Sequence, residues 1–189
     1  IKSKVFGPNQ SILEWTDDGI TYEADPRHVM KILRELELEN SKEVTTPGVK
    51  TDVIKNEETD EAELQGSEAT KFRGIAARCN YLARDRPDIV LATKEITRRM
   101  SKPCKADWAN VKRLGRYLKG RPRAVVWYPW QEDRHQVEAY TDSDWAGCRR
   151  TRRSTTGGTI MIGDHMIKCY SKTQPNIALS SGEAELYAI

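Results

Sequence analysis

The amino-acid sequence predicts a protein that mixes α-helices with β-strands, of the α+β or α/β class. Three observations indicate this class. Apolar and polar residues alternate around an Asp-Gly turn near the N-terminus, apolar residues recur at helical spacing through the middle, and short strand-like segments follow residue 123 before a last helical segment. The chain has 189 residues, which is enough for one domain or two small ones with a buried core.

The N-terminal part predicts a hairpin followed by a helix. The hairpin is "SILEWTDDGITYEAD", in which Asp17 and Asp18 precede a glycine and therefore occupy the turn. The helix follows directly, because Asp25 can cap it and Pro26 suits its first position. Its buried face is predicted to hold Val29, Ile32, Leu33 and Leu36.

Charge is distributed unevenly along the middle of the chain. Residues 52–68 contain seven acids and one lysine, which predicts a flexible acidic linker. Residues 94–123 contain eleven bases and two acids. This segregation suggests a basic face for a polyanion, although a solvated helix face is the commoner explanation of a charge run.

Two stretches in the middle of the chain have helical periodicity. In the first, Phe72, Ile75, Ala76, Cys79 and Leu82 line one face, and the "DRP" at residues 85–87 ends one helix and starts the next. In the second, residues 106–120, Trp108, Val111, Leu114 and Leu118 share one side. The other side carries a basic stripe that could track a phosphate backbone or only solvate the helix. Its members are Lys112, Arg113, Arg116 and Lys119.

The pattern changes to strands after residue 123. Segments 124–130 and 136–147 read as two strands, and a Gly163-Asp164 turn joins two more into a hairpin. The final stretch, "ALSSGEAELYAI", begins a helix. The expected order is therefore strands, a hairpin and a helix.

Two carboxylates in this part call for an explanation. Asp142 falls near the middle of a predicted strand, where a buried carboxylate is costly unless it is paired or bound to a metal. In the last helix, Ser180 and Glu183 have capping-box spacing, which gives Glu183 a structural role. Glu185 has no such role and is free to meet Asp142, so the pair predicts a site for a hard cation such as Mg²⁺.

Other kinds of site are not indicated. The four cysteines form no CxxC pair and the three histidines have no ligand spacing, so we expect no zinc site. Without a signal peptide or an apolar run long enough to span a bilayer, we expect an intracellular protein with reduced thiols and no membrane partner.

Several motifs carry a resemblance to a known family. "YTDSDWAG", "TRRSTTGG" and "SKTQPNIALSSGEAELYAI" resemble the ribonuclease H region of copia-type long-terminal-repeat retrotransposon polyproteins. "YLARDRPDIVLATKEITRRMSKP" and "DWANVKRLGRYLKG" resemble the segment that connects their reverse transcriptase to that ribonuclease H, and "GITYEADPRHVMKIL" with "TTPG" resembles the end of the reverse transcriptase. The blocks follow the family's order over nearly the whole chain.

The resemblance implies a helical connection segment followed by a truncated ribonuclease H-like mixed sheet. Residues 1–50 are then the C-terminal end of the reverse transcriptase, 51–68 the acidic linker, 69–123 the connection segment and 124–189 an incomplete ribonuclease H-like domain. The parent is expected to be an RNA-directed DNA polymerase that also hydrolyses RNA in RNA/DNA hybrids. The alternative is a degenerate or truncated module that binds nucleic acid without catalysis.

The resemblance also assigns site residues. Asp142 matches the first aspartate of the family's site and Glu185 its helical glutamate, and together with later aspartates they hold Mg²⁺ or Mn²⁺. Because those later aspartates lie beyond this helix in the family, we expect little hydrolysis by this chain alone. Asp144 either joins the metal site, caps the strand end or bonds to the following "TRRST" segment.

The segment after the strand is rich in arginine. Its side chains either contact phosphates of a hybrid or belong to an exposed polar loop. They are Arg149, Arg150, Arg152 and Arg153. The expected partners are an RNA/DNA hybrid or other nucleic acid and the upstream polymerase domain, in the cytoplasm (within virus-like particles) or in the nucleus.

Overall fold

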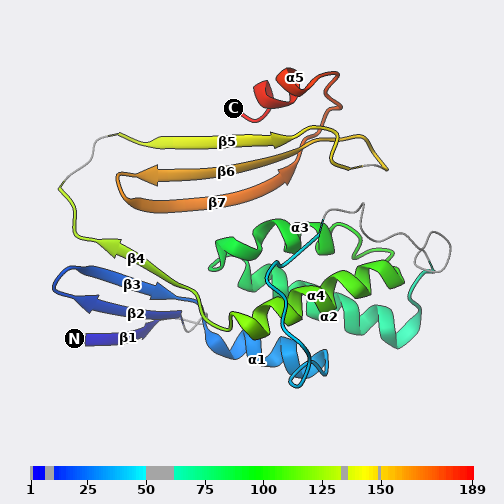
Figure 1. Ribbon diagram of the computed structural model, residues 1–189, viewed down its shortest axis with the longest axis horizontal. Helices are drawn as coiled ribbons and strands as arrows, with labels where there is room; N and C mark the ends of the chain where they lie inside the picture. The colour runs from blue at the N-terminus through cyan, green and yellow to red at the C-terminus, as the bar shows by residue number, and fades with distance from the viewer. Residues whose placement is uncertain (1, 7–10, 50–61, 133–135, 149) are drawn as a thin grey trace. The chain divides into compact units, whose positions relative to one another are not determined.

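The computed structural model describes residues 2–6, 11–49, 62–132, 136–148 and 150–189 (Figure 1). Helices and strands are mixed, as the sequence predicts. The chain divides into two compact units, of which the first holds Ile1–Thr16 and Thr21–Val126 and the second holds Asp17–Ile20 and Trp127–Ile189. The elements in chain order are β1 (Lys2–Phe6), β2 (Ser11–Thr16), β3 (Gly19–Glu23), α1 (Pro26–Glu35), α2 (Gly66–Leu82), η2 (Pro87–Ile89), α3 (Val90–Thr97), α4 (Lys105–Gly120), β4 (Val125–Pro129), β5 (Glu138–Asp144), β6 (Thr155–Ile162), β7 (His165–Thr173) and α5 (Ser181–Leu186).

The predicted N-terminal hairpin and helix are both present. Asp17 and Asp18 form the turn between β2 and β3, which confirms the hairpin. The side chain of Asp25 accepts a hydrogen bond from the Arg27 N–H at 2.9 Å and caps α1, and Pro26 opens the helix. The predicted face is buried, since Val29, Ile32, Leu33 and Leu36 are all at most 5% exposed.

The core of the first unit lies between its helices. Phe72, Ile75 and Cys79 of α2 are fully buried, and the Phe72 ring lies 6.2 Å from that of Trp108, centroid to centroid. Burial raises the pKa of the Cys79 thiol to about 12, so this cysteine serves packing. The helical faces predicted from periodicity are therefore confirmed.

Only the end of the acidic stretch belongs to the described residues. Residues 50–61, most of the predicted linker, lie outside the described residues. From Leu64 onward the chain is packed, because the Leu64 N–H donates to Pro103 O at 2.8 Å and its side chain is 6% exposed. α2 begins at Gly66, three residues before residue 69, where the helical connection segment was predicted to begin.

The strands form two sheets. One has the order β1-β2-β3-β4, so β4 pairs with β3. The other has the order β5-β6-β7 and is antiparallel throughout (Figure 1). A mixed sheet was predicted, but the described strands of this sheet are antiparallel and need no crossover. β6 and β7 join through Gly163 and Asp164, with Gly163 in the left-handed region at φ 56°.

The second unit has a core of small side chains. Among its described residues, the buried apolar ones are Cys148, Ala178, Ala184 and Ala188. The larger members of the hydrophobic core all belong to the first unit. The described part of the second unit therefore buries no large apolar side chain, whereas Ser154, Thr155, Thr156 and Gln174 are buried polar residues of it.

Candidate nucleic-acid and metal site

Asp142 lies on the edge strand of the three-stranded sheet. It belongs to β5, where it pairs with Gly157 of β6, and its side chain is exposed. The strand pattern predicted a buried position for Asp142, at which the carboxylate would have a desolvation cost. That prediction is wrong for the described strands, because an edge position leaves the carboxylate in water.

Glu185 comes to the β5 edge beside Asp142. Its Oε1 accepts a hydrogen bond from the Ser143 N–H at 3.2 Å, and Ser143 is the next residue after Asp142. The two candidate carboxylates, 43 positions apart in sequence, thus lie on neighbouring parts of one unit. Glu185 is itself exposed.

The start of α5 is fixed by its own side chains. Ser180 Oγ accepts from the Glu183 N–H at 3.1 Å, as the capping-box spacing predicts. Glu183 reaches back to the Leu179 N–H at 2.7 Å and also accepts from the Tyr187 hydroxyl at 2.7 Å. The backbone hydrogen bond from Leu179, aided by that of Tyr187, holds the pKa of Glu183 below its ordinary value. Glu183 is therefore occupied by the cap, whereas Glu185 takes no part in it.

Gln174 holds α5 against the sheet, and sequence reasoning missed it. The side chain is buried, and its Nε2 donates to Thr156 Oγ1 at 3.1 Å and to Ala184 O at 2.8 Å. Its backbone N–H donates to Ser154 O at 2.9 Å. A glutamine in the polar stretch "SKTQPN" gives no local sign of burial, so no sequence signal was available.

The site offers oxygen ligands suited to Mg²⁺. Two exposed carboxylates contribute, with Glu185 Oε1 held by a backbone N–H. Across the described part of the chain, no group of three or more His, Cys, Asp and Glu side chains is placed to hold a metal ion. Because Mg²⁺ is commonly bound by one or two carboxylates with water and phosphate completing its shell, the donor set fits this cation.

Asp144 lies over the turn that follows β5. The Gly147 N–H donates to Asp144 O at 3.2 Å. A Cβ built on Gly147 would overlap the Asp144 carboxylate, so that carboxylate is folded onto the turn. Of the three roles considered for Asp144, this contact favours capping of the strand end.

The arginine-rich loop is closed by its backbone. The Cys148 N–H donates to Arg153 O at 3.1 Å, and the Ala146 N–H donates to Ser154 Oγ at 3.1 Å. The side chains of Arg150, Arg152 and Arg153 are exposed, while Arg149 lies outside the described residues. The loop therefore presents cations next to the end of β5, which keeps both of its predicted readings open.

Most of the basic stripe on α4 is bound within the first unit. Arg113 Nη2 donates to Thr46 Oγ1 at 2.7 Å, Arg116 Nε to Lys42 O at 2.6 Å and Lys119 Nζ to Ser41 O at 2.5 Å. Lys112 is exposed, and its Nζ lies 5.9 Å from the centroid of the Trp108 ring. Three of the four cations thus anchor residues 41–46, a role that neither reading of the stripe had anticipated.

Replacing Arg116 with Ala should loosen residues 41–46. The Lys42 carbonyl loses a charged donor, which is worth about 1.5–3 kcal/mol and less where water can take its place. Amide hydrogen exchange should then accelerate in residues 41–46. The control is Lys112→Ala, which removes a cation of the same helix without a bond to this segment, and equal acceleration in both variants would contradict the anchoring role.

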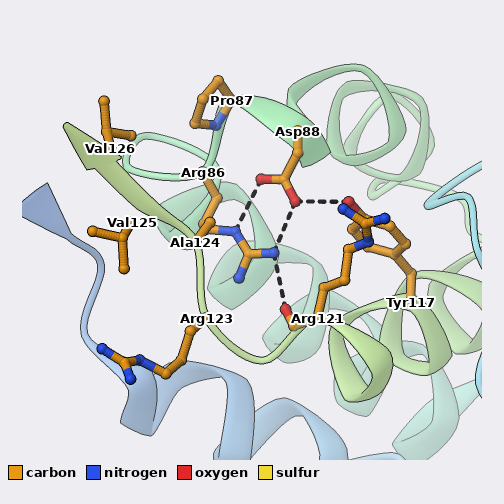
Figure 2. A pocket seen from close by; sticks show the side chains of 9 residues that line it. All are labelled: Arg86, Pro87, Asp88, Tyr117, Arg121, Arg123, Ala124, Val125 and Val126. Carbon is orange, nitrogen blue, oxygen red and sulfur yellow. Dashed lines mark hydrogen bonds and ion pairs between the residues drawn. The ribbon is translucent and has the colours of Figure 1, made fainter.

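A small pocket in the first unit surrounds a buried arginine (Figure 2). Its volume is about 250 Å³. Arg86 is 1% exposed and binds Asp88 through Nε at 2.9 Å and Nη2 at 2.8 Å, and Nη2 also donates to Arg121 O at 3.0 Å. The Tyr117 hydroxyl donates to Asp88 at 2.9 Å, whereas the Arg123 side chain points away from this network (Figure 2). Arg123 pairs with Glu23 instead. Since these charges already compensate one another, the pocket is a structural network and not a second site.

Among the helices of the described ranges, none is long and apolar enough to cross a bilayer.

Several curated proteins are similar to the chain. An uncharacterized mitochondrial protein from Arabidopsis thaliana is 41% identical over 118 residues, which cover 62% of the chain and 49% of that protein. The retrovirus-related Pol polyprotein from transposon RE1 of the same plant is 30% identical over 163 residues, covering 86% of the chain and 11% of the polyprotein. The corresponding polyprotein from transposon TNT 1-94 of Nicotiana tabacum is 27% identical over 194 residues, covering 98% and 14%.

The chain spans about half of the mitochondrial relative and a much smaller share of each polyprotein. No family model and no solved structure matches it. The similarity nevertheless extends over most of the chain and agrees with the resemblance of its motifs. The chain belongs to the family of retrovirus-related Pol polyproteins of copia-type transposons.

Proposed function

We propose that the chain spans the C-terminal end of the reverse transcriptase, the connection segment and the start of the ribonuclease H of a Pol polyprotein, and that Asp142 and Glu185 belong to the ribonuclease H site. The parent would hydrolyse the RNA strand of RNA/DNA hybrids. The observation that carries the proposal is the hydrogen bond from the Ser143 N–H to Glu185, which brings the helical carboxylate beside the strand carboxylate. It is independent of the motif comparison that also selects these residues.

Each residue has a distinct part in the proposed site. Asp142 and Glu185 would hold Mg²⁺, which when bound activates water and stabilises the leaving oxygen of the RNA strand. The Ser143 N–H orients the Glu185 carboxylate, and Gln174 keeps α5 in place. The exposed cations Arg150, Arg152 and Arg153 would attract the phosphates of the hybrid.

Binding of a labelled RNA/DNA hybrid to the 189-residue chain, followed by fluorescence anisotropy over a range of salt and Mg²⁺ concentrations, tests the proposal. We expect affinity to fall steeply as salt increases and to rise with Mg²⁺. Asp142→Asn or Glu185→Gln should weaken the apparent Mg²⁺ affinity by at least about tenfold, because changes even to groups that only orient metal ligands cost about that much.

Asp164→Asn is the matched control. Asp164 is an exposed aspartate in the turn between β6 and β7, so its loss should leave the Mg²⁺ dependence unchanged. Hybrid binding that does not respond to Mg²⁺, or an equal loss in the Asp142→Asn and Asp164→Asn variants, would remove the basis for a metal site at Asp142.

The second candidate function is a module that binds nucleic acid without cutting it. It is favoured by the fact that only two candidate carboxylates come together among the described residues, whereas three cations of the adjacent loop are exposed. Little product is expected from this chain alone under either function. Rapid Mg²⁺-dependent hydrolysis that Asp142→Asn abolishes would reject the binding-only function.

A further inference from the structure

Two adjacent glycines occupy the interior of β6. Gly157 and Gly158 lie between β-branched residues, in a strand that pairs on both sides. Glycine weakens the interior of a strand, so its presence there often marks a place where a side chain, a backbone or a ligand approaches closely. Because successive residues of a strand face opposite sides of the sheet, the two glycines need separate explanations.

Gly158 is explained by packing within the unit. It pairs with Tyr170 of β7, and a Cβ built on Gly158 would overlap the Tyr170 ring. Lys168 lies two residues before Tyr170 and on the same face, and its Nζ is 5.6 Å from the centroid of that ring. The absence of a side chain at Gly158 therefore makes room for an aromatic ring of the protein itself.

Gly157 has no such explanation in the fold. A Cβ built there has no heavy atom within 4 Å among the described residues. Its backbone is also not in the left-handed region, where Gly19, Gly66 and Gly163 are the glycines with positive φ. Any ordinary residue would fit, and a β-branched one would suit the strand better.

The neighbours of Gly157 identify the place. It pairs with Asp142 on one side and with Ser171 on the other, so the three side-chain positions lie in one row across one face. The two neighbouring rows on the same face carry mainly small polar side chains on β6 and β7. One row consists of Tyr140, Thr159 and Cys169, and the other of Asp144, Thr155 and Thr173. The face is thus mainly polar, and the position that lacks a side chain lies beside Asp142.

We infer that Gly157 is kept without a side chain so that a sugar–phosphate strand of nucleic acid can lie against the sheet beside Asp142. The inference rests on the proposed function and adds to it a residue that limits access to the site. Charge supports this occupant over an apolar one, because the loop that joins β5 to β6 carries three exposed cations, Arg150, Arg152 and Arg153, and Arg153 precedes Gly157 by four residues.

The test uses Gly157→Val in the hybrid-binding assay at saturating Mg²⁺. We expect the melting temperature to stay the same or rise, since the new side chain meets open space. Affinity for the RNA/DNA hybrid should fall about tenfold, the factor that corresponds to a steric cost of about 1.4 kcal/mol. Gly157→Ala should cause a smaller loss in the same direction.

Two glycines serve as controls. Gly158→Ala should lower the melting temperature, because it collides with Tyr170. Gly74→Ala in α2, where a Cβ also meets open space, should leave hybrid affinity unchanged.

The outcomes separate the two proposals. If the wild-type chain binds no hybrid, the proposed function fails and this inference with it. If the wild type binds in a manner sensitive to Asp142→Asn but Gly157→Val binds equally well, this inference alone is overturned. It is also overturned if Gly157→Val lowers the melting temperature as Gly158→Ala does, because Gly157 would then be a packing residue.

Discussion

Replacing Arg86 with Ala is expected to lower the free energy of unfolding by about 3 kcal/mol. The guanidinium is buried and serves both oxygens of Asp88 and the Arg121 carbonyl, so its loss leaves these acceptors without their charged donor. Removing one partner of a buried ion pair costs about 3–5 kcal/mol, and the lower end applies because Asp88 is 30% exposed. Urea unfolding followed by circular dichroism measures the change.

Arg84→Ala provides the matched control for Arg86→Ala. Arg84 is exposed and precedes Arg86 by two residues, so its replacement should change the free energy of unfolding by no more than about 0.5 kcal/mol. Equal effects of the two substitutions would show that the network around Asp88 does not stabilise the first unit.

The same network predicts a dependence on pH. Burial raises the pKa of Asp88, but hydrogen bonds and charge from Arg86, with the Tyr117 hydroxyl, outweigh it and hold this pKa below the ordinary value of 3.8. Because the folded pKa is lowered, the stabilisation is complete above 3.8 and is lost as the pH falls through the folded value. The difference between wild type and Arg86→Ala should therefore shrink in acid, and a constant difference would contradict this assignment.

Replacing Gln174 with Ala is expected to cost about 2–3 kcal/mol and to release α5 from the sheet. Thr156 Oγ1 and Ala184 O both lose their donor in a buried place, and an unpaired buried polar group costs about 1–3 kcal/mol. The second unit has few large buried apolar residues to compensate. Amide exchange in Ser181–Leu186 should accelerate, and the Mg²⁺ dependence of hybrid binding should weaken because Glu185 leaves the β5 edge.

Asn176→Ala is the control for Gln174→Ala. Asn176 is exposed in the same connection between β7 and α5, so neither exchange nor Mg²⁺ dependence should change. If Gln174→Ala accelerated exchange but left the Mg²⁺ dependence intact, Gln174 would stabilise the helix without positioning Glu185.

Local features were predictable because their causes lie within a few residues. Asp25 and Pro26 start α1, and Ser180 with Glu183 starts α5, in each case through contacts that span at most four positions. Glu185 could be selected for the same reason, since capping occupies Glu183. The family resemblance then added the role proposed for Asp142.

Contacts between distant residues were not predictable in this way. Arg116 is separated from Lys42 by 74 positions, and a stripe of cations looks the same whether it faces solvent or a chain segment. Arg86 and Gln174 are polar residues of polar stretches, and their burial depends on which elements pack over them. The position of β5 at a sheet edge likewise depends on which strands pair, and it decides that Asp142 is exposed.

The sequence by itself therefore determined the helices, the hairpins, the caps and the two candidate carboxylates, because periodicity and turn chemistry act over short distances. Only the tertiary structure decided which cations are bound inside the first unit, which glycine of β6 is explained by packing, and that Glu185 reaches the backbone next to Asp142. These outcomes follow from the pairing of residues far apart in the chain, for which local sequence carries no signal.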